Sequence, residues 1–124
     1  MTPAEIQEGL NQHTGTFQYY RLSPHMVLTD GTAWLAEAAG AYWLMQAIDS
    51  WQPRCRKDEM LQEIQFWTLA VRPDKSARLT CYRDTNDPAF HQDIEYTDFP
   101  LTEIRLYVEP LDECQSVILL PSEH

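Results

Sequence analysis

The stretch from Thr32 to Trp51, TAWLAEAAGAYWLMQAIDSW, constrains the fold more than any other part of the sequence. It consists mainly of good helix formers and holds three of the four tryptophans. Its few polar residues do not line up, since Glu37 and Gln46 point to opposite sides at about 100° per residue. A helix that is apolar nearly all round is usually buried. Interior polar groups such as Asp49 argue against a membrane span, so we expect one core helix of about five and a half turns.

This helix should pack on a sheet, and its apolar circumference exceeds what one sheet face can cover. We therefore expect Trp34 or Trp51 to lie at a subunit contact or under an N-terminal helix, and a homodimer is a hypothesis. Gly40 should lie where helix and sheet approach closely. The side chains expected to be buried against the sheet are Leu35, Ala39, Tyr42, Leu44, Met45 and Ile48.

The remaining segments predict a single α+β domain over residues 1–124. Thr2-Pro3-Ala4-Glu5 is typical of a capped helix start, and that helix should run to about His13. Residues 17–22 and 25–29 read as a hairpin, and Asp30 or Thr32 should cap the central helix. Short turns favour antiparallel strands, so we predict a two-layer fold with an antiparallel sheet of about five strands packed on one long apolar helix. The strands expected in that sheet are Gln65–Val71, Ala77–Tyr82, Phe90–Thr97, Ile104–Val108 and Val117–Leu120.

The net charge of −10 is unevenly distributed along the chain. Residues 1–83 hold nine acidic and eight basic residues, whereas residues 84–124 hold ten acidic residues and one basic residue, Arg105. The final third therefore carries −9 and should produce a strong negative field. Direct binding to nucleic acid or to an anionic membrane surface needs the opposite sign, so neither is expected.

The three cysteines, Cys55, Cys81 and Cys114, match neither a disulfide framework nor a zinc pattern. The sequence lacks the basic segment followed by an apolar run that is typical of a signal peptide, so we expect none. We expect a reducing, cytoplasmic setting. The chain has no glycine-rich phosphate loop and no G-x-S-x-G motif. We therefore expect no cofactor, no bound metal and no recognisable catalytic residue.

Five groups of short segments resemble a family that we know. They are HTGT at 13–16 with YYR at 19–21, TDG at 29–31 with LAE at 35–37 and AGAYWL at 39–44, FWTL at 66–69, IEYTDFPL at 94–101, and LLPSE at 119–123. Together they resemble a family of small bacterial proteins of unknown function, frequent in cyanobacteria and around mobile genetic elements. The resemblance covers nearly the whole chain and implies no activity.

We hypothesise that the protein binds a basic protein partner through its acidic third. Carboxylates along strands can imitate the charge of a nucleic-acid backbone, so the protein would inhibit a nucleic-acid-binding partner. An anti-CRISPR or other anti-defence protein would fit the mobile-element setting, an association by analogy only. The residues expected to bind the partner are Asp84, Asp87, Asp93, Glu95, Asp98 and Glu103.

Other hypotheses stay open at this point. One is a homo-oligomeric structural or assembly protein. Another is a metal-dependent hydrolase, with His91, Asp93 and Glu95 on one strand face and the two carboxylates about 6.6 Å apart at strand rise. The acidic third could also serve solubility alone. If so, the basic link at Arg54–Lys57 or the aromatic pair Tyr19-Tyr20 becomes the better candidate for a binding surface.

Overall fold

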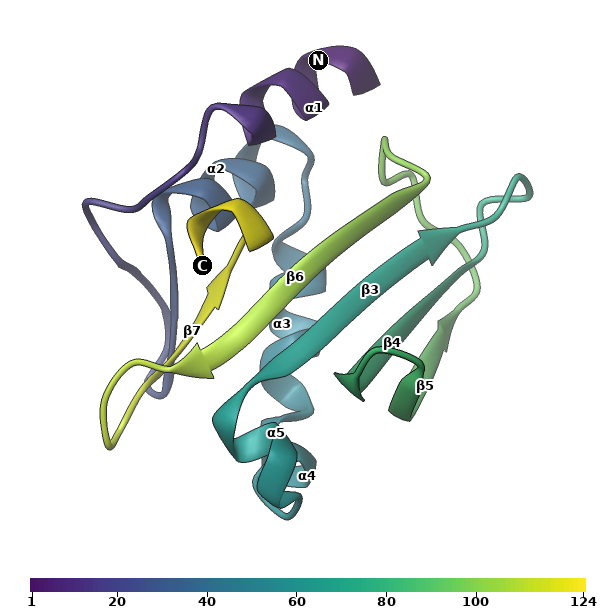
Figure 1. Cartoon of the computed structure of the whole chain (residues 1–124). Coiled ribbons are helices and arrows are strands. Elements are labelled where there is room, and N and C mark those ends of the chain that lie inside the picture. The colour runs from purple at the N-terminus through teal and green to yellow at the C-terminus, as the bar shows by residue number, and fades with distance from the viewer.

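A seven-stranded mixed sheet forms the centre of the molecule, and α2 and α3 lie across one of its faces (Figure 1). The computed structural model describes residues 1–124. The strand order is β1-β2-β7-β6-β3-β4-β5, and every neighbouring pair is antiparallel except β2 and β7, which are parallel. The strands are β1 (Tyr20–Ser23), β2 (Met26–Leu28), β3 (Gln65–Val71), β4 (Ala77–Asp84), β5 (Asp87–Ile94), β6 (Glu103–Pro110) and β7 (Ser116–Leu119).

The helices are short, and this overturns the predicted fold. They are α1 (Pro3–Asn11), α2 (Asp30–Ala38), α3 (Tyr42–Ser50), α4 (Gln52–Cys55), α5 (Glu59–Glu63) and a 3₁₀ turn, η1 (Pro121–Glu123). An α+β fold is correct, but one long apolar helix on a five-stranded antiparallel sheet is wrong. The predicted hairpin joins the same sheet as the five later strands, because β7 inserts between β2 and β6.

The expected long helix is divided at Gly40, which adopts a left-handed conformation with φ of +61°. The Ala41 amide donates to the carbonyl of Ala36 across this residue at 2.8 Å, as in a Schellman helix terminus. A glycine suits that conformation because it has no Cβ. Gly40 is exposed and no heavy atom would meet a Cβ built on it within 4 Å, so the expected close approach to the sheet is wrong.

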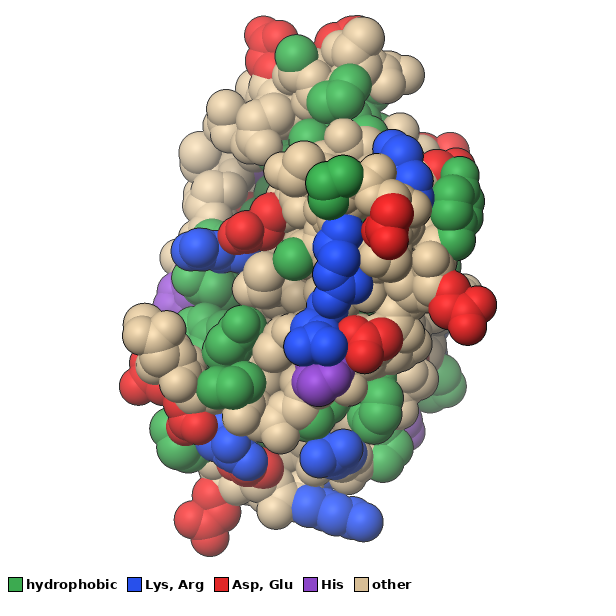
Figure 2. Space-filling view, turned by 90° about the vertical axis from the view of Figure 1, so that its right-hand side faces the viewer, with side chains coloured by type: hydrophobic (Ala, Val, Ile, Leu, Met, Phe, Trp, Pro, Cys, Tyr) green, Lys and Arg blue, Asp and Glu red, His purple; other side chains and the backbone are tan.

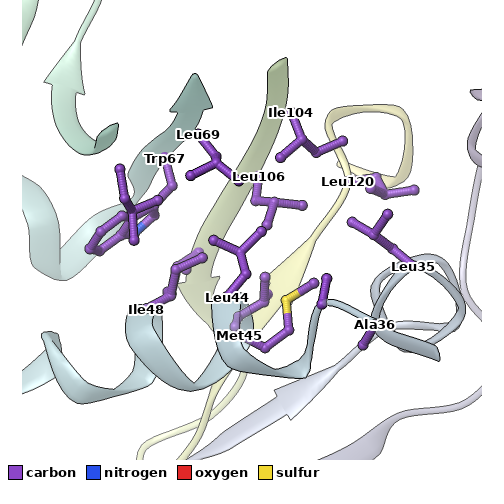
Figure 3. Packing of buried hydrophobic residues seen from close by; sticks show 14 of the residues in the cluster. Leu35, Ala36, Leu44, Met45, Ile48, Trp67, Leu69, Ile104, Leu106 and Leu120 are labelled. Atoms are coloured by element: carbon purple, nitrogen blue, oxygen red, sulfur yellow. The ribbon is translucent and has the colours of Figure 1, made fainter. Parts of the chain in front are cut away.

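The core lies between two layers, the helices α2 and α3 on one side and the sheet on the other (Figure 3). We call the face of the sheet that these helices cover the covered face. Figure 3 shows Leu44, Met45 and Ile48 of α3 pointing toward side chains of β3 and β6, among them Trp67 and Leu106. Leu35, Leu44, Met45 and Ile48 are fully buried, as predicted. Ala39 is only half-buried, and Tyr42 is 45% exposed, because both flank the break at Gly40.

Two tryptophans of the expected helix are covered within the chain. Trp34 lies beneath α1, where it packs against Gly9 and stacks near His13 with ring centroids 5.7 Å apart. Trp51 packs on Phe90 of β5, with centroids 4.9 Å apart. The homodimer stays a prediction, and these tryptophans no longer supply the free apolar surface on which it was argued.

Side-chain caps fix the starts of the helices. Thr2 and Glu5 form the predicted capping box of α1. Thr29 caps α2 and Thr32 completes its capping box, so Asp30 is not the cap and is free for another role. Glu123 adds a second cap from the far end of the chain. Its carboxylate accepts from Thr29 Oγ1 at 2.7 Å and from the Gly31 amide at 3.0 Å.

The sheet confirms some predicted strands and corrects others. β3 has the predicted bounds, and β4 pairs with it as a hairpin. The third strand was predicted to be Phe90–Thr97, but β5 begins and ends three residues earlier. The alternation therefore fails beyond Ile94: Tyr96, predicted inward, is 69% exposed, and Thr97, predicted outward, is buried. None of the helices has both the length and the apolar character that crossing a membrane requires.

Candidate functional site

The six acidic residues predicted to bind a partner lie on strands β4, β5 and β6 or in the segment between β5 and β6. Asp84 and Asp87 flank the β4–β5 turn, where Asn86 has φ of 59°. Asp93 is the second-to-last residue of β5, and Glu103 is the first residue of β6. The last two, Glu95 and Asp98, belong to the segment between β5 and β6, so the predicted shared strand face of Asp93 and Glu95 is wrong.

Arginines lie within ion-pair distance of three of these six carboxylates, although the shorter ion pair of Arg83 is with Asp58, at 2.6 Å. Arg78 of β4 pairs with Asp93 at 2.8 Å, and Arg83 lies 3.5 Å from Asp87. Within β6, Arg105 pairs with Glu103 at 3.1 Å. The charge asymmetry of the sequence is thus reduced in space, because β4 carries arginines from the balanced part of the chain onto its neighbour β5. Figure 2 accordingly shows acidic and basic side chains interspersed on this side of the molecule.

The remaining three predicted residues form no ion pair. Asp84 accepts only from the neighbouring Thr85 amide, at 2.7 Å, and Glu95 and Asp98 are exposed. Asp84 lies at the β4–β5 turn, whereas Glu95 and Asp98 follow β5 at the opposite end of that hairpin, so these three unpaired carboxylates do not form one cluster.

The geometry does not assemble the hydrolase site considered from sequence. His91 Nε2 lies 3.7 Å from Asp93 Oδ2, but Asp93 is engaged by Arg78, which holds the pKa of this carboxyl below its usual value. Glu95 lies beyond the end of β5. No group of three or more His, Cys, Asp or Glu side chains is arranged so that it could hold a metal ion.

A second candidate site is a surface hollow of about 810 Å³ at the junction of the α1–β1 loop, α2 and the start of α3. We call it the aromatic hollow, because four of its lining side chains are Phe, Tyr or Trp. Phe17 is 97% exposed, and Tyr20 and Tyr42 are each more than 40% exposed. Its lining residues are Gln12, His13, Thr14, Gly15, Phe17, Tyr20, Asp30, Ala33, Trp34, Glu37 and Tyr42.

Asp30 organises the loop at the rim of this hollow. Its Oδ2 accepts from the Phe17 amide at 2.7 Å and from the Gln18 amide at 3.4 Å, and its own amide donates to Thr16 Oγ1 at 3.0 Å. The Phe17 hydrogen bond lowers the pKa of Asp30, so the carboxylate stays ionised. The Tyr20 hydroxyl lies beside it, and hydrogen bonding to Asp30 raises the pKa of Tyr20.

Glu37 places a second carboxylate in the hollow. It is exposed on α2, and its Oε2 lies 3.4 Å from the Tyr42 hydroxyl, which donates to it. No lysine or arginine lines the hollow. His13 Nδ1 lies 2.9 Å from the Gly9 carbonyl oxygen. Because a carbonyl oxygen can only accept, Nδ1 is the donor in this hydrogen bond and carries a proton. The hollow therefore combines two carboxylates with aromatic faces.

A third candidate site is a depression of about 380 Å³ on the face of the sheet opposite the covered face, which we call the open face. Aromatic residues of three strands, Phe66, Tyr82 and Tyr107, line it together with Arg105. Two predicted residues, Asp84 and Glu103, contribute to the same depression. Its charges are mixed, so it selects no ligand charge as clearly as the aromatic hollow does.

Two buried thiols lie in contact outside these sites. Cys55 of α4 and Cys81 of β4 are both buried, and their hydrogen bond and burial raise the pKa of Cys81. The expected exposed basic link is therefore only partly exposed. Arg54, Arg56 and Lys57 face solvent, whereas Cys55 belongs to the core.

Sequence reasoning did not single out Phe17, Asp30, Glu37 and Tyr42 as one site, although it named the neighbouring Tyr19-Tyr20 pair. The signal was present in the segments that carry the family resemblance. HTGT at 13–16, TDG at 29–31, LAE at 35–37 and AGAYWL at 39–44 all contribute to the lining of the aromatic hollow.

Comparison with known proteins gives a family and no activity. No curated protein and no solved structure matches the chain. One family model matches residues 4–124, nearly the whole chain, as the resemblance in the sequence implied. The chain therefore belongs to DUF6876, a family of unknown function.

Proposed function

We propose that this protein binds a basic protein and thereby inhibits the binding of nucleic acid by that partner. The observation that supports the proposal is the net charge of −10 together with three exposed carboxylates that form no ion pair, Asp84, Glu95 and Asp98. A negative field of this kind attracts a basic surface over long range and speeds association at low salt.

Charge alone does not make this surface equivalent to a nucleic-acid backbone. Duplex DNA carries one negative charge per about 1.7 Å of helix axis. On the sheet, the register places Asp93, Arg78, Ala70 and Glu103 side by side across β5, β4, β3 and β6. Asp93 and Glu103 are therefore three strand spacings apart, about 14 Å, with an arginine between them. We infer that the acidic surface steers the partner and that other contacts hold it.

The setting of the proposed partner comes from the family resemblance. Small bacterial proteins around mobile genetic elements gain from blocking host defence, so a nucleic-acid-guided defence complex such as a CRISPR effector is the partner we propose. Action in the cytoplasm belongs to the same proposal, because such complexes work there.

Charge reversal with a matched control tests the proposal. The variant Asp84→Lys/Glu95→Lys/Asp98→Lys removes the unneutralised charge, whereas Glu8→Lys/Glu63→Lys/Glu113→Lys makes the same change in net charge at exposed positions on α1, α5 and the β6–β7 turn. A partner is first captured from a bacterial lysate at low salt, identified by mass spectrometry and purified. Binding is then measured with purified components over a range of salt, with and without the partner's nucleic acid.

We expect the first variant to bind at least about tenfold more weakly, mainly through slower association, and the control variant to bind nearly like the wild type. Added nucleic acid should displace the protein from its partner. Equal binding by both variants, or binding that nucleic acid does not disturb, would contradict the proposal.

A further inference from the structure

We propose that the aromatic hollow binds the guanidinium group of an arginine side chain on a protein partner. This inference rests on the proposed function insofar as the partner is a basic protein, and it supplies the short-range contact that the acidic surface lacks. The geometry that carries it is the placement of Asp30 and Glu37 among the aromatic side chains of Phe17, Tyr20 and Tyr42.

The charge of the hollow selects a cation. Both lining carboxylates lack a lysine or arginine partner, unlike Asp87, Asp93 and Glu103 on the sheet. Asp30 Oδ2 accepts from two backbone amides, and the Tyr20 hydroxyl lies beside this carboxylate, which has no ion pair within the chain. Glu37 has only a long contact with the Tyr42 hydroxyl, at 3.4 Å. Carboxylate oxygens are therefore available to the N–H donors of an incoming cation.

The aromatic walls favour a cation that is flat. A guanidinium group can stack on an aromatic face while its edge donates to carboxylates, whereas an ammonium group is a compact, strongly hydrated point charge. One arginine of the chain already lies over aromatic rings outside the hollow. The guanidinium carbon of Arg54 lies 4.4 Å from the ring centroid of Phe90 and 5.9 Å from that of Trp51.

Exposure of the aromatic side chains indicates a protein rather than a free metabolite as the source of the arginine. Four of the eight large hydrophobic side chains that are exposed lie in or beside the hollow: Phe17, Tyr19, Tyr20 and Tyr42. Contiguous exposed apolar surface with a polar rim is typical of protein–protein contact sites. A volume of about 810 Å³ also has room for residues that flank the arginine.

Short blocked peptides test this site without the partner. The probes are three acetylated and amidated pentapeptides with a central arginine, lysine or citrulline between glycines, where citrulline is a neutral isostere of arginine. Binding is followed by NMR through the indole N–H signal of Trp34, which lines the hollow. We expect shifts that saturate with the arginine peptide, at least about threefold weaker binding of the lysine peptide, and no binding of the citrulline peptide.

Variants with matched controls locate the binding. Glu37→Gln should weaken arginine-peptide binding at least about fivefold, whereas Glu63→Gln, also exposed on a helix, should leave it unchanged. Phe17→Ala should weaken it about two- to fivefold, as expected for an exposed cation–π contact, and Tyr96→Ala, which removes another exposed aromatic ring, should have no effect. Phe17 is so exposed that its loss should not affect folding.

Several results would overturn the inference. One is equal binding of the arginine and citrulline peptides; another is arginine-peptide binding that Glu37→Gln and Phe17→Ala leave unchanged, since diffuse attraction to the acidic protein would then explain it. The reversal Asp84→Lys/Glu95→Lys/Asp98→Lys should still bind the peptide at the hollow. Loss of partner capture by that reversal alone, with normal peptide binding by the hollow variants, would refute the hollow and leave the proposed function standing.

Discussion

The two faces of the sheet differ sharply even though the same strands build both. On β3, the side chains of Trp67 and Leu69 are about 1% exposed on the covered face, while those of the alternating residues Phe66 and Thr68 are only half-buried on the open face. The same alternation holds on β4 and β6, where buried and solvent-exposed positions follow each other.

This difference separates stability from recognition. The covered face contributes apolar burial, which is the main source of folding free energy. The open face carries ion pairs between exposed side chains, which contribute little to stability and leave the surface free to vary. Binding surfaces should therefore be sought on the open face and at the loops, and the predictions below test how complete the separation is.

The largest difference is expected between neighbouring residues of β3. Leu69→Ala should lower the free energy of unfolding by about 2–5 kcal/mol, because it leaves a cavity among α3, β3 and β6. Thr68→Ala, one residue away on the open face, should change it by less than about 0.5 kcal/mol. Urea denaturation followed by tryptophan fluorescence measures both. Similar values for the two variants would show that the open face also carries stability.

The next effect concerns how the helical layer is held over the covered face. Glu123→Gln should cost about 1–3 kcal/mol, because an amide NH₂ would face N–H donors that the carboxylate now accepts from Gly31 and Leu120. The exposed Glu113→Gln is the matched control and should be neutral. Thermal unfolding at constant pH compares the two. An unchanged transition for Glu123→Gln would mean that α2 does not depend on this cap.

A smaller effect is expected where α2 turns into α3. Gly40→Ala should destabilise the protein by about 1 kcal/mol, because alanine resists the left-handed conformation even though there is space for its methyl group. Gly15→Ala, where an added Cβ also meets nothing within 4 Å and no left-handed φ is required, should have a smaller effect. Denaturant midpoints at equal m value provide the comparison. If the two glycine variants are equally stable, the turn tolerates a side chain.

The smallest effect should come from the Arg78–Asp93 ion pair on the open face. Arg78 lowers the pKa of Asp93, so the stability that the pair contributes is present above the unfolded pKa of about 3.9 and is lost as pH falls through the lower folded pKa. Asp93→Asn should therefore flatten the fall in stability below about pH 4, and added salt should mask the difference. Chemical denaturation between pH 2 and pH 7, with Glu95→Gln as the unpaired control, measures this. Identical acid profiles for wild type and Asp93→Asn would contradict it.

Local patterns in the sequence were reliable where a single element decided the structure. The capping box at Thr2 and Glu5 and the bounds of β3 needed only neighbouring residues. The break at Gly40 was missed because a lone glycine in a long apolar run is compatible with a continuous helix. Its left-handed conformation follows from the different directions that α2 and α3 take over the sheet, which is tertiary information.

Non-local contacts account for the other errors. Residues 17–19 read as strand because of their aromatic side chains, but the Phe17 and Gln18 amides donate to Asp30 instead of to a neighbouring strand. The parallel pairing of β2 with β7 joins segments about ninety residues apart. The aromatic hollow was missed for the same reason, since it takes residues from three separate segments. The acidic residues were easy to find by composition, but two of the three arginines that pair with them, Arg78 and Arg83, lie on the neighbouring strand β4.

The central position of β7 has a consequence for how the protein is made. As the chain leaves the ribosome, β1 and β2 can pair early, and β3 to β6 can pair later, yet no strand pairing joins the two groups until residues 116–119 emerge. Only then can Glu123 reach α2 and Ser122 Oγ reach the His13 carbonyl, at 2.6 Å. Long-range pairing of this kind slows folding. A nascent chain that stalls near Pro110 would expose the edges of β2 and β6 together with the uncovered core, which makes it a target for chaperones or proteases.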